Sequence, residues 1–196
     1  MANYEIIDGV AILPEGIEMI EDGAFKNCKE LKRVVIPQWV RRIGEDAFWR
    51  CENLEVVELP EWLEDIGSSA FSGCSSLATL QIGNGVSSIG NNAFSGCDAL
   101  HSVYITDLSA WCSIDFSNGD YTNPLSHGIK LYLNNEELTE LVIPKGVTGI
   151  NSKAFIGCRS LKKVTVGNDV TSIGYAAFAN CKSLATVNIL DGVATI

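Results

Sequence analysis

Apolar and polar residues alternate in short stretches of this chain, and the alternation returns at a fixed interval. Within residues 77–99, Leu80 and Ile82 are apolar while Thr79 and Gln81 are polar, which is the pattern of a strand with one buried face. The equivalent apolar pairs are Val34/Ile36, Val57/Leu59, Val103/Ile105, Leu141/Ile143, Val164/Val166 and Val187/Ile189. The pattern predicts one short strand in each unit, and stacking of the units predicts a parallel sheet on one face.

Each unit also carries an Ala-Phe pair followed three residues later by a cysteine. The phenylalanines are Phe25, Phe48, Phe71 and Phe94, spaced by 23 residues, and then Phe155 and Phe178, again 23 apart. The cysteines are Cys28, Cys51, Cys74, Cys97, Cys158 and Cys181. A fixed period of this length is the signature of a solenoid. The steps of three between Phe94, Cys97 and Leu100 predict a short helical or 3₁₀ turn with one buried stripe, so the predicted class is an α/β solenoid.

The unit reads L-x-x-V-x-I-P-x-G-V-x-x-I-G-x-x-A-F-x-x-C-x-x-L, and this pattern closely resembles the BspA-like, or Treponema pallidum type, leucine-rich repeat. The resemblance covers residues 8–99 and 138–196 in register. It implies that residues 1–196 form one right-handed leucine-rich-repeat solenoid. It also implies adhesion or protein binding rather than catalysis, and a place on the bacterial cell surface or outside the cell.

Residues 100–137 interrupt the repeat with 38 residues, 15 more than one period. Asn134-Asn135 is a dipeptide that tolerates positive φ and predicts a hairpin near residues 130–143. Loops on rigid scaffolds often carry binding residues, and the candidates here are Asp115, Asn118, Asp120, Tyr121 and His127, with a plain solvated loop as the alternative. The segment "DFSNGD" lacks the glycine and closing glutamate positions of a calcium loop.

The recurring cysteines are interpreted as small apolar fillers that form a buried column. Disulfides between neighbouring turns are the alternative, because stacked turns lie about 4.8 Å apart. The sequence contains no Cys-x-x-Cys or Cys/His spacing of the kind that predicts a zinc site. A thiol–imidazole pair of Cys112 and His127 is supported only by the presence of both residues in the irregular turn. We therefore expect no cofactor and no enzyme activity.

Two successive corners carry a tryptophan, Trp39 and Trp62, and Trp49 lies nearby in sequence. The same corner position elsewhere is Gly16, Gly85, Gly146 or Asp169. Tryptophan in left-handed backbone would cost about 1 kcal/mol or more unless the corner adopts another shape. The pair is interpreted either as an exposed platform for a partner or as a shield over the corner. The other candidate binding residues face outward on the predicted sheet: Arg33, Val35, Val56, Glu58, Gln81 and Tyr104.

The net charge of −10 argues against nucleic acid as a partner, because phosphate binding needs a clustered basic surface. The charge is uneven: residues 1–66 hold 15 acids and 7 bases, a net of −8, and residues 67–196 hold 9 and 7, a net of −2. Glu18, Arg41 and Glu64 follow one another at intervals of 23 residues. Arg42 and Asp65 are also 23 residues apart. Opposite charges are therefore expected to face each other across neighbouring turns.

No apolar run approaches the roughly 20 residues that span a bilayer, and the first residues lack the features of a secretory signal. The sequence thus predicts an interaction or adhesion module for a protein or glycan partner on a host or microbial surface, with a cytoplasmic location left open. A spacer or stalk segment of a larger repeat protein is the alternative. Ile196 aligns with Ile173 and no polar cap follows, which predicts a fragment or end-to-end self-association.

Overall fold

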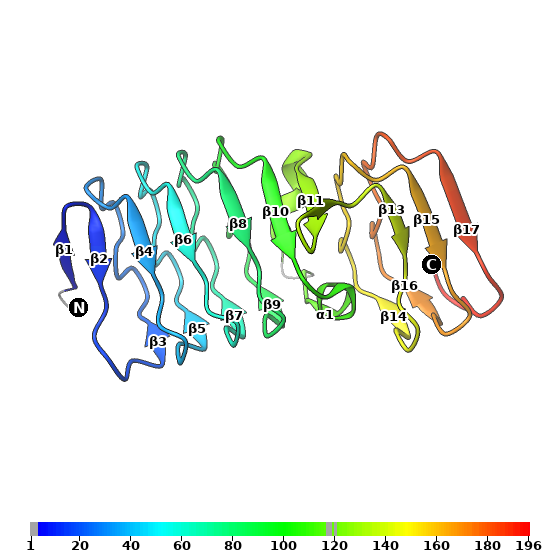
Figure 1. The fold of residues 1–196 in the computed structure, drawn as a ribbon, viewed down its shortest axis with the longest axis horizontal. Coiled ribbons are helices and arrows are strands. Elements are labelled where there is room, and N and C mark those ends of the chain that lie inside the picture. Colours follow the sequence, from blue (N-terminus) through cyan, green and yellow to red (C-terminus); the bar gives the residue numbers. More distant parts are fainter. Residues whose placement is uncertain (1–3, 117–118, 120) are drawn as a thin grey trace.

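The computed structural model describes residues 4–116, 119 and 121–196. Figure 1 shows an elongated solenoid in which longer strands form one row and shorter strands form a second row. The longer strands are β2 (Val10–Ile12), β4 (Arg33–Val35), β6 (Val56–Glu58), β8 (Thr79–Gln81), β10 (Ser102–Ile105), β11 (Lys130–Leu133), β13 (Glu140–Val142), β15 (Lys163–Val166) and β17 (Thr186–Ile189). The shorter strands are β3 (Met19–Ile20), β5 (Arg42–Ile43), β7 (Asp65–Ile66), β9 (Ser88–Ile89), β14 (Gly149–Ile150) and β16 (Ser172–Ile173).

Neighbouring turns pair in parallel with the register that the repeat predicts. Val34 in β4 lies opposite Val57 in β6, and Leu141 in β13 lies opposite Val164 in β15. The shorter strands follow the same rule in the order β3-β5-β7-β9 and β14-β16. The offset between partners is one repeat, so the same inward position of each turn meets its equivalent in the next.

Stacked phenylalanine rings fill the interior beside the strands. The ring centroids of Phe25 and Phe48 lie 5.1 Å apart, those of Phe48 and Phe71 5.1 Å, and those of Phe71 and Phe94 5.6 Å, with nearly parallel planes. Phe155 and Phe178 continue the pattern at 5.4 Å after the interruption. Because each ring packs on the next, every turn of the solenoid depends on its neighbours for burial.

The stretch around each phenylalanine is a run of tight turns, not the helical turn that the sequence predicts. Asp46 and Arg50 flank Phe48 at two residues on either side, and both have φ of 55°. A helix keeps every residue at negative φ. The Phe48 N–H donates to Ala70 O of the next turn at 2.7 Å, whereas the Cys51 N–H closes a local turn onto Phe48 O at 3.1 Å. Hydrogen bonds along the solenoid axis therefore replace those of a helix.

Helix in the described part of the chain is confined to the irregular turn, in α1 (Leu108–Ser113) and the 3₁₀ segment η1 (Pro124–His127). The regular turns therefore form a parallel β-solenoid, and the α/β description does not hold for them. In Figure 1, α1 lies between β9 and β14 in the row of shorter strands. The Asp107 side chain caps it by accepting hydrogen bonds from the N–H groups of Ser109, at 2.6 Å, and Ala110, at 3.4 Å.

The irregular turn is built into the stack by buried polar contacts. Trp111 on α1 is buried and donates its indole N–H to Ala154 O at 2.9 Å. Asn123 is also buried, and its side-chain amide donates to Lys153 O at 2.9 Å and Ala154 O at 2.8 Å. These bonds tie the inserted residues to the first regular turn that follows them.

The predicted hairpin is present but shorter than expected. β11 pairs antiparallel with β12 (Glu136–Glu137), and Asn134 and Asn135 between them have φ of 51° and 67°. Two consecutive residues at positive φ form the tight turn that matches the twist of a hairpin. The strand that begins at Glu140 is β13, which belongs to the parallel sheet instead.

A second hairpin lies at the N-terminal end and was missed from the sequence. β1 (Glu5–Ile7) pairs antiparallel with β2 across Asp8 and Gly9, which have φ of 51° and 82°. The Asp-Gly dipeptide is a strong hairpin signal that could have revealed it.

No helix in the described part of the structure is long and apolar enough to cross a membrane.

Candidate functional site

The cysteine column is structural. The thiols of Cys51, Cys74 and Cys97 donate to the carbonyl oxygens of phenylalanines in the preceding turn at 3.0, 3.2 and 3.2 Å. All seven cysteines of the chain are free, so the alternative of disulfides between turns is wrong. Burial raises the pKa of Cys51 and of Cys112 to about 12. A nucleophilic cysteine needs a lowered pKa, so neither thiol is poised for the chemistry of a thiol–imidazole pair.

The two corner tryptophans are exposed. Trp39 is 46% exposed and Trp62 is 60% exposed. The turn at the first corner is closed by the Val40 N–H, which donates to Pro37 O at 3.1 Å, and neither tryptophan has positive φ. Gly146, at the same corner position of a later turn, has φ of 87°. Gly85 and Asp169, at the same position of two other corners, also lack positive φ. Left-handed backbone is therefore not required at this corner, and the tryptophans avoid its steric cost.

Arginine side chains line the second corner. The Arg41 guanidinium donates to Trp62 O at 3.3 Å and pairs with the Glu64 carboxylate at 3.3 Å. Arg42 pairs with Asp65 at 3.2 Å, which confirms the predicted charge pairing between these turns. Such exposed pairs contribute about 0.2–1 kcal/mol each. Among the aromatic contacts of the described residues, none joins the two indoles, so Trp39 and Trp62 present separate rings.

The outward sheet positions beside these corners alternate between apolar and charged side chains. Val35 and Val56 are 44% and 43% exposed. In the register of β4 and β6, Val35 lies opposite Glu58 and Val56 lies opposite Arg33, and the Arg33 guanidinium pairs with the Glu58 carboxylate. Gln81 in β8 is exposed as well. The structure thus places these sequence-predicted residues on one accessible face, in successive turns.

Tyr104 lies further along the sheet and stacks on a residue that sequence reasoning missed. Its ring centroid lies 4.8 Å from that of Tyr132, and the two tyrosines are partners in the β10–β11 register. The offset between them is 28 residues instead of 23 (132 − 104 = 28), so the repeat period could not reveal the pair. Both rings are half-buried and help to line a hollow of about 560 Å³.

The hollow beside the tyrosines opens between the irregular turn and the regular turn after it. It adjoins a second hollow of about 320 Å³, and the two share His127, Gly128 and Arg159. We call the joint space the Arg159 groove. Its other polar lining residues are His101, Ser102, Ser126, Lys130, Asn180 and Lys182. Sequence reasoning identified only Tyr104 and His127 of this set, because the remainder come together across the interrupted register.

The loop candidates divide between structural and exposed roles. Asp115 pairs with Ser88 of β9 and so extends the row of shorter strands. Tyr121 is 51% exposed and stacks on His127 with a centroid distance of 5.4 Å. Asn118 and Asp120 lie outside the described residues. No group of three or more histidine, cysteine or acidic side chains in the described chain could hold a metal ion.

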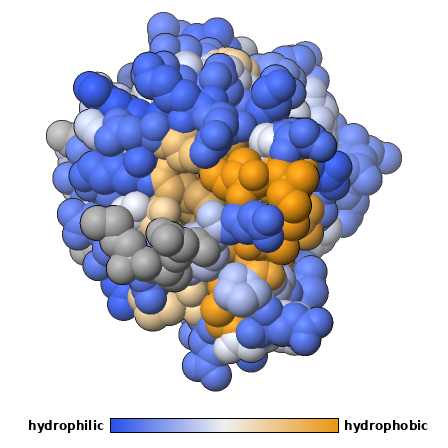
Figure 2. All heavy atoms as spheres, turned by 90° about the vertical axis from the view of Figure 1, so that its left-hand side faces the viewer, coloured by the Kyte–Doolittle hydropathy of each residue, from blue (hydrophilic) through white to orange (hydrophobic). Residues whose placement is uncertain are grey.

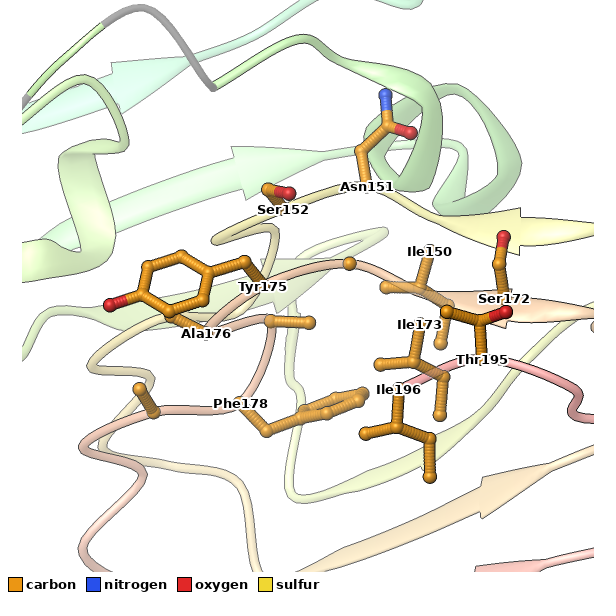
Figure 3. Close-up of a pocket in the computed structure, with 13 residues that line it drawn as sticks. Ile150, Asn151, Ser152, Ser172, Ile173, Tyr175, Ala176, Phe178, Thr195 and Ile196 are labelled. Atoms are coloured by element: carbon orange, nitrogen blue, oxygen red, sulfur yellow. The ribbon is translucent and has the colours of Figure 1, made fainter.

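Both ends of the solenoid expose apolar side chains. Figure 2 shows apolar atoms gathered on the N-terminal end, where Ile7 and Ile12 are each 48% exposed. At the other end, Figure 3 shows Ile150, Ile173 and Ile196 in register beside the Phe178 ring. These are inward positions of the repeat, so the pocket that they line is the end of the core. The predicted alignment of Ile196 with Ile173 is confirmed by the pairing of Thr195 with Ser172.

Comparison with known proteins places the repeats in a family. A model of the BspA type leucine rich repeat region matches six copies over residues 10–119 and 128–196. The chain belongs to the BspA type leucine-rich repeat family. The gap between the matched ranges falls in the irregular turn, which follows from the loss of the 23-residue period there.

Several solved structures resemble the chain, among them leucine-rich repeat proteins. A T. pallidum leucine rich repeat protein is 25% identical, with 90% of this chain and 78% of that one covered and a TM-score of 0.47. The pneumococcal vaccine antigen PcpA is 23% identical, with 90% and 44% covered and a TM-score of 0.54. A leucine rich cell surface protein from Faecalibacterium prausnitzii is 22% identical, with 90% and 67% covered and a TM-score of 0.33. A search of curated proteins found no significant match to the chain.

Proposed function

We propose that this BspA type repeat chain is a non-catalytic binding module for a protein or glycan partner on a host or microbial surface. The observation that carries the proposal is the exposure of Trp39 and Trp62 in two successive turns, next to the exposed valines Val35 and Val56 on the same turns. Tryptophan is enriched among the residues that anchor binding interfaces. Repeat proteins use such extended surfaces for recognition.

The partner surface consists of the corner and the outward sheet positions. Arg33 and Glu58 supply charge beside the valines, and Gln81 and Tyr104 extend the surface toward the irregular turn. The net charge of −10 disfavours nucleic acid as the partner. We place the protein on the cell surface or outside the cell, in line with the family resemblance. We further propose that residues 1–196 act as one solenoid unit.

Replacing both corner tryptophans is expected to weaken partner binding. The Trp39→Ser/Trp62→Ser variant should lose at least about 10-fold in affinity for its partner, because two large exposed anchors are removed. Affinity is measured against a panel of matrix glycoproteins, mucins and bacterial surface polysaccharides, with folding checked by circular dichroism.

Trp49 provides the matched control for this variant. Its ring is covered by the Lys26 ammonium, at 4.7 Å, and the Arg50 guanidinium, at 4.4 Å. Trp49→Ser should therefore leave panel binding unchanged. If binding survives in the double variant, the tryptophans are not the site. If no panel member binds the wild-type chain, the spacer alternative is favoured.

End-to-end association is a second proposal, favoured by apolar exposure at both ends. Ile12 near one end is 48% exposed, and Val187 and Ile189 at the other are 51% and 44% exposed. A contact between unlike ends builds open chains of molecules. We expect Ile189→Lys to lower the average molar mass measured by light scattering at about 100 μM protein, because it places a charge in an apolar contact. A wild-type chain that stays monomeric at that concentration contradicts the proposal.

A further inference from the structure

The Arg159 groove gathers three cationic side chains, Arg159, Lys182 and Lys130, in a chain with a net charge of −10. Arg159 and Lys182 occupy the same position of successive repeats, directly after Cys158 and Cys181 (159 + 23 = 182). Like charges on neighbouring strands or turns destabilise each other. Neither side chain has an ion-pair partner among the described residues, so no ion pair neutralises either charge in that part of the protein.

The same repeat position elsewhere shows how the fold normally treats a cation. Lys29 directly follows Cys28, and one turn later the equivalent residue is Glu52, which pairs with Lys29 at 3.3 Å. The next two equivalents are Ser75 and Asp98. In the first turns a cation is thus followed by an acid, whereas at Arg159 a cation is followed by another cation.

The backbone around Arg159 leaves room for its side chain at the mouth of the groove. Gly128 ends η1 with φ of 74°, and a Cβ atom there would lie 2.5 Å from Arg159 Nε. The guanidinium therefore lies against the glycine, where a larger residue would displace it. His127 directly precedes Gly128 in the sequence and lines both hollows. Arg159 and Lys182 are both exposed, so their positive charges are accessible to a ligand at the mouth of the groove.

The remaining lining supplies hydroxyl and amide groups. Ser102 and Ser126 contribute hydroxyls, Tyr104 and Tyr132 contribute phenols, and Asn180 contributes an amide. His101 Nδ1 lies 2.9 Å from Ser102 Oγ. Lys130 is already paired with Glu137 at 2.9 Å. Such a lining matches a ligand with many hydroxyl groups better than an apolar peptide side chain, which binds in pockets of hydrophobic residues.

We propose that the Arg159 groove binds an acidic saccharide, whose carboxylate or sulfate group is held by Arg159 and Lys182 while its hydroxyls meet the serine, tyrosine and asparagine side chains. The fork of an arginine guanidinium matches the geometry of such oxyanions. The two hollows that make up the groove, of about 560 and 320 Å³, are each in the size range of small-ligand sites. The inference rests on the proposed binding function and adds a ligand class and a site separate from Trp39 and Trp62.

The test compares short oligosaccharides that carry acidic groups with neutral ones, and sulfated and neutral dextran form the pair matched in sugar and linkage. Galacturonic acid oligosaccharides carry carboxylates, sulfated dextran oligosaccharides carry sulfates, and neutral dextran oligosaccharides carry neither. Binding is measured by titration calorimetry at about 0.15 M salt, where long-range attraction between charges is screened. We expect at least one acidic probe to bind the wild-type chain and the neutral probe not to bind.

Arg159→Ser is the diagnostic variant and Lys29→Ser is its matched control. Serine stands at this repeat position as Ser75, so the fold accommodates it, and each substitution removes one positive charge. Arg159→Ser should weaken binding of the acidic probe by about 10-fold or more, as expected for loss of a charged hydrogen bond. Lys29→Ser should leave that binding unchanged.

Four results would overturn the inference. Two concern the probes: absence of binding by both acidic probes, and binding of a short polyaspartate peptide as tightly as the saccharides, which would assign the groove to acidic peptides. Two concern the variants: unchanged binding in Arg159→Ser, and an equal loss in the two serine variants. The proposed function is judged separately. If the surface panel binds through Trp39 and Trp62 while Arg159→Ser changes nothing, the binding module stands and the acidic-saccharide site does not.

Discussion

Raising the pH from about 8 to about 10.5 is expected to destabilise the folded chain steeply, because the buried thiols hold their protons there and the unfolded chain releases them. Burial raises the pKa of Cys51, Cys97 and Cys112 to about 12, against about 8.5 for a free cysteine. Burial likewise raises the pKa of Cys74. The thiols are protonated in both the folded and the unfolded state below about pH 8.5, so their full contribution to the free energy of unfolding is present there.

The sign and size of the effect follow from proton binding. Above about pH 8.5 the folded state binds more protons than the unfolded state, so the free energy of unfolding falls until the folded pKa near 12 is reached. Each thiol contributes a slope of about 1.4 kcal/mol per pH unit within that window. Three such thiols together give about 4 kcal/mol per unit, a large share of the stability of a typical domain.

Urea unfolding at a series of pH values, under reducing conditions, measures the slope. Deprotonation of exposed lysines also weakens ion pairs at high pH, so a thiol-specific control is needed. The Cys51→Ala/Cys97→Ala variant has two fewer buried thiols and should show a shallower slope by about 3 kcal/mol per pH unit. A slope that is the same in both proteins would assign the alkaline instability to other groups.

Phe71→Ala is expected to cost about 3–5 kcal/mol of unfolding free energy, because it opens a cavity in the middle of the ring column. Phe71 is fully buried between Phe48, at 5.1 Å, and Phe94, at 5.6 Å. Removal of its ring deprives both neighbours of a stacking contact, and Phe48 keeps only its contact with Phe25. In a solenoid the interfaces between turns carry much of the stability, so the unfolding transition should also broaden as the two sides uncouple.

The matched control is Phe178→Ala at the same repeat position. Phe178 is half-buried, and its ring contact in the structure is with Phe155 at 5.4 Å. Phe178→Ala should lower the free energy of unfolding clearly less than Phe71→Ala does, as measured by urea unfolding monitored by circular dichroism. Phe71→Leu, which keeps most of the volume, should recover part of the loss. Equal costs for Phe71→Ala and Phe178→Ala would mean that the column does not act through stacking on both sides.

The sequence predicted the regular turns well because each repeat meets the same environment. The strand pairs, the 23-residue register and the column of Phe and Cys side chains are confirmed, since one inward position faces its equivalent one turn away. The helical turn was wrong because steps of three are shared by helices and by successive tight turns. Positive φ at residues such as Ser69, Lys153 and Ala176 gives no signal in their side chains.

The candidate binding surface was predicted only in part. Trp39 and Trp62 were visible as departures from the glycine or aspartate of other corners, and both side chains are exposed in the structure. The Arg159 groove was not visible, because its residues come from the irregular turn and from two later repeats. Tyr132 lies 28 residues from its partner Tyr104, so no periodic alignment brings them together.

The sequence by itself determined the solenoid, its period, the inward residues and the interrupted turn, because hydrophobic periodicity dictates which side chains must be buried together. The tertiary structure alone decided the backbone path of the turns and which residues surround Arg159. Hydrogen bonds between neighbouring turns, such as that from Phe48 N–H to Ala70 O, hold Asp46 and Arg50 at positive φ against their local preference. Contacts across the interrupted register depend on where the inserted residues fold, which local sequence patterns do not encode.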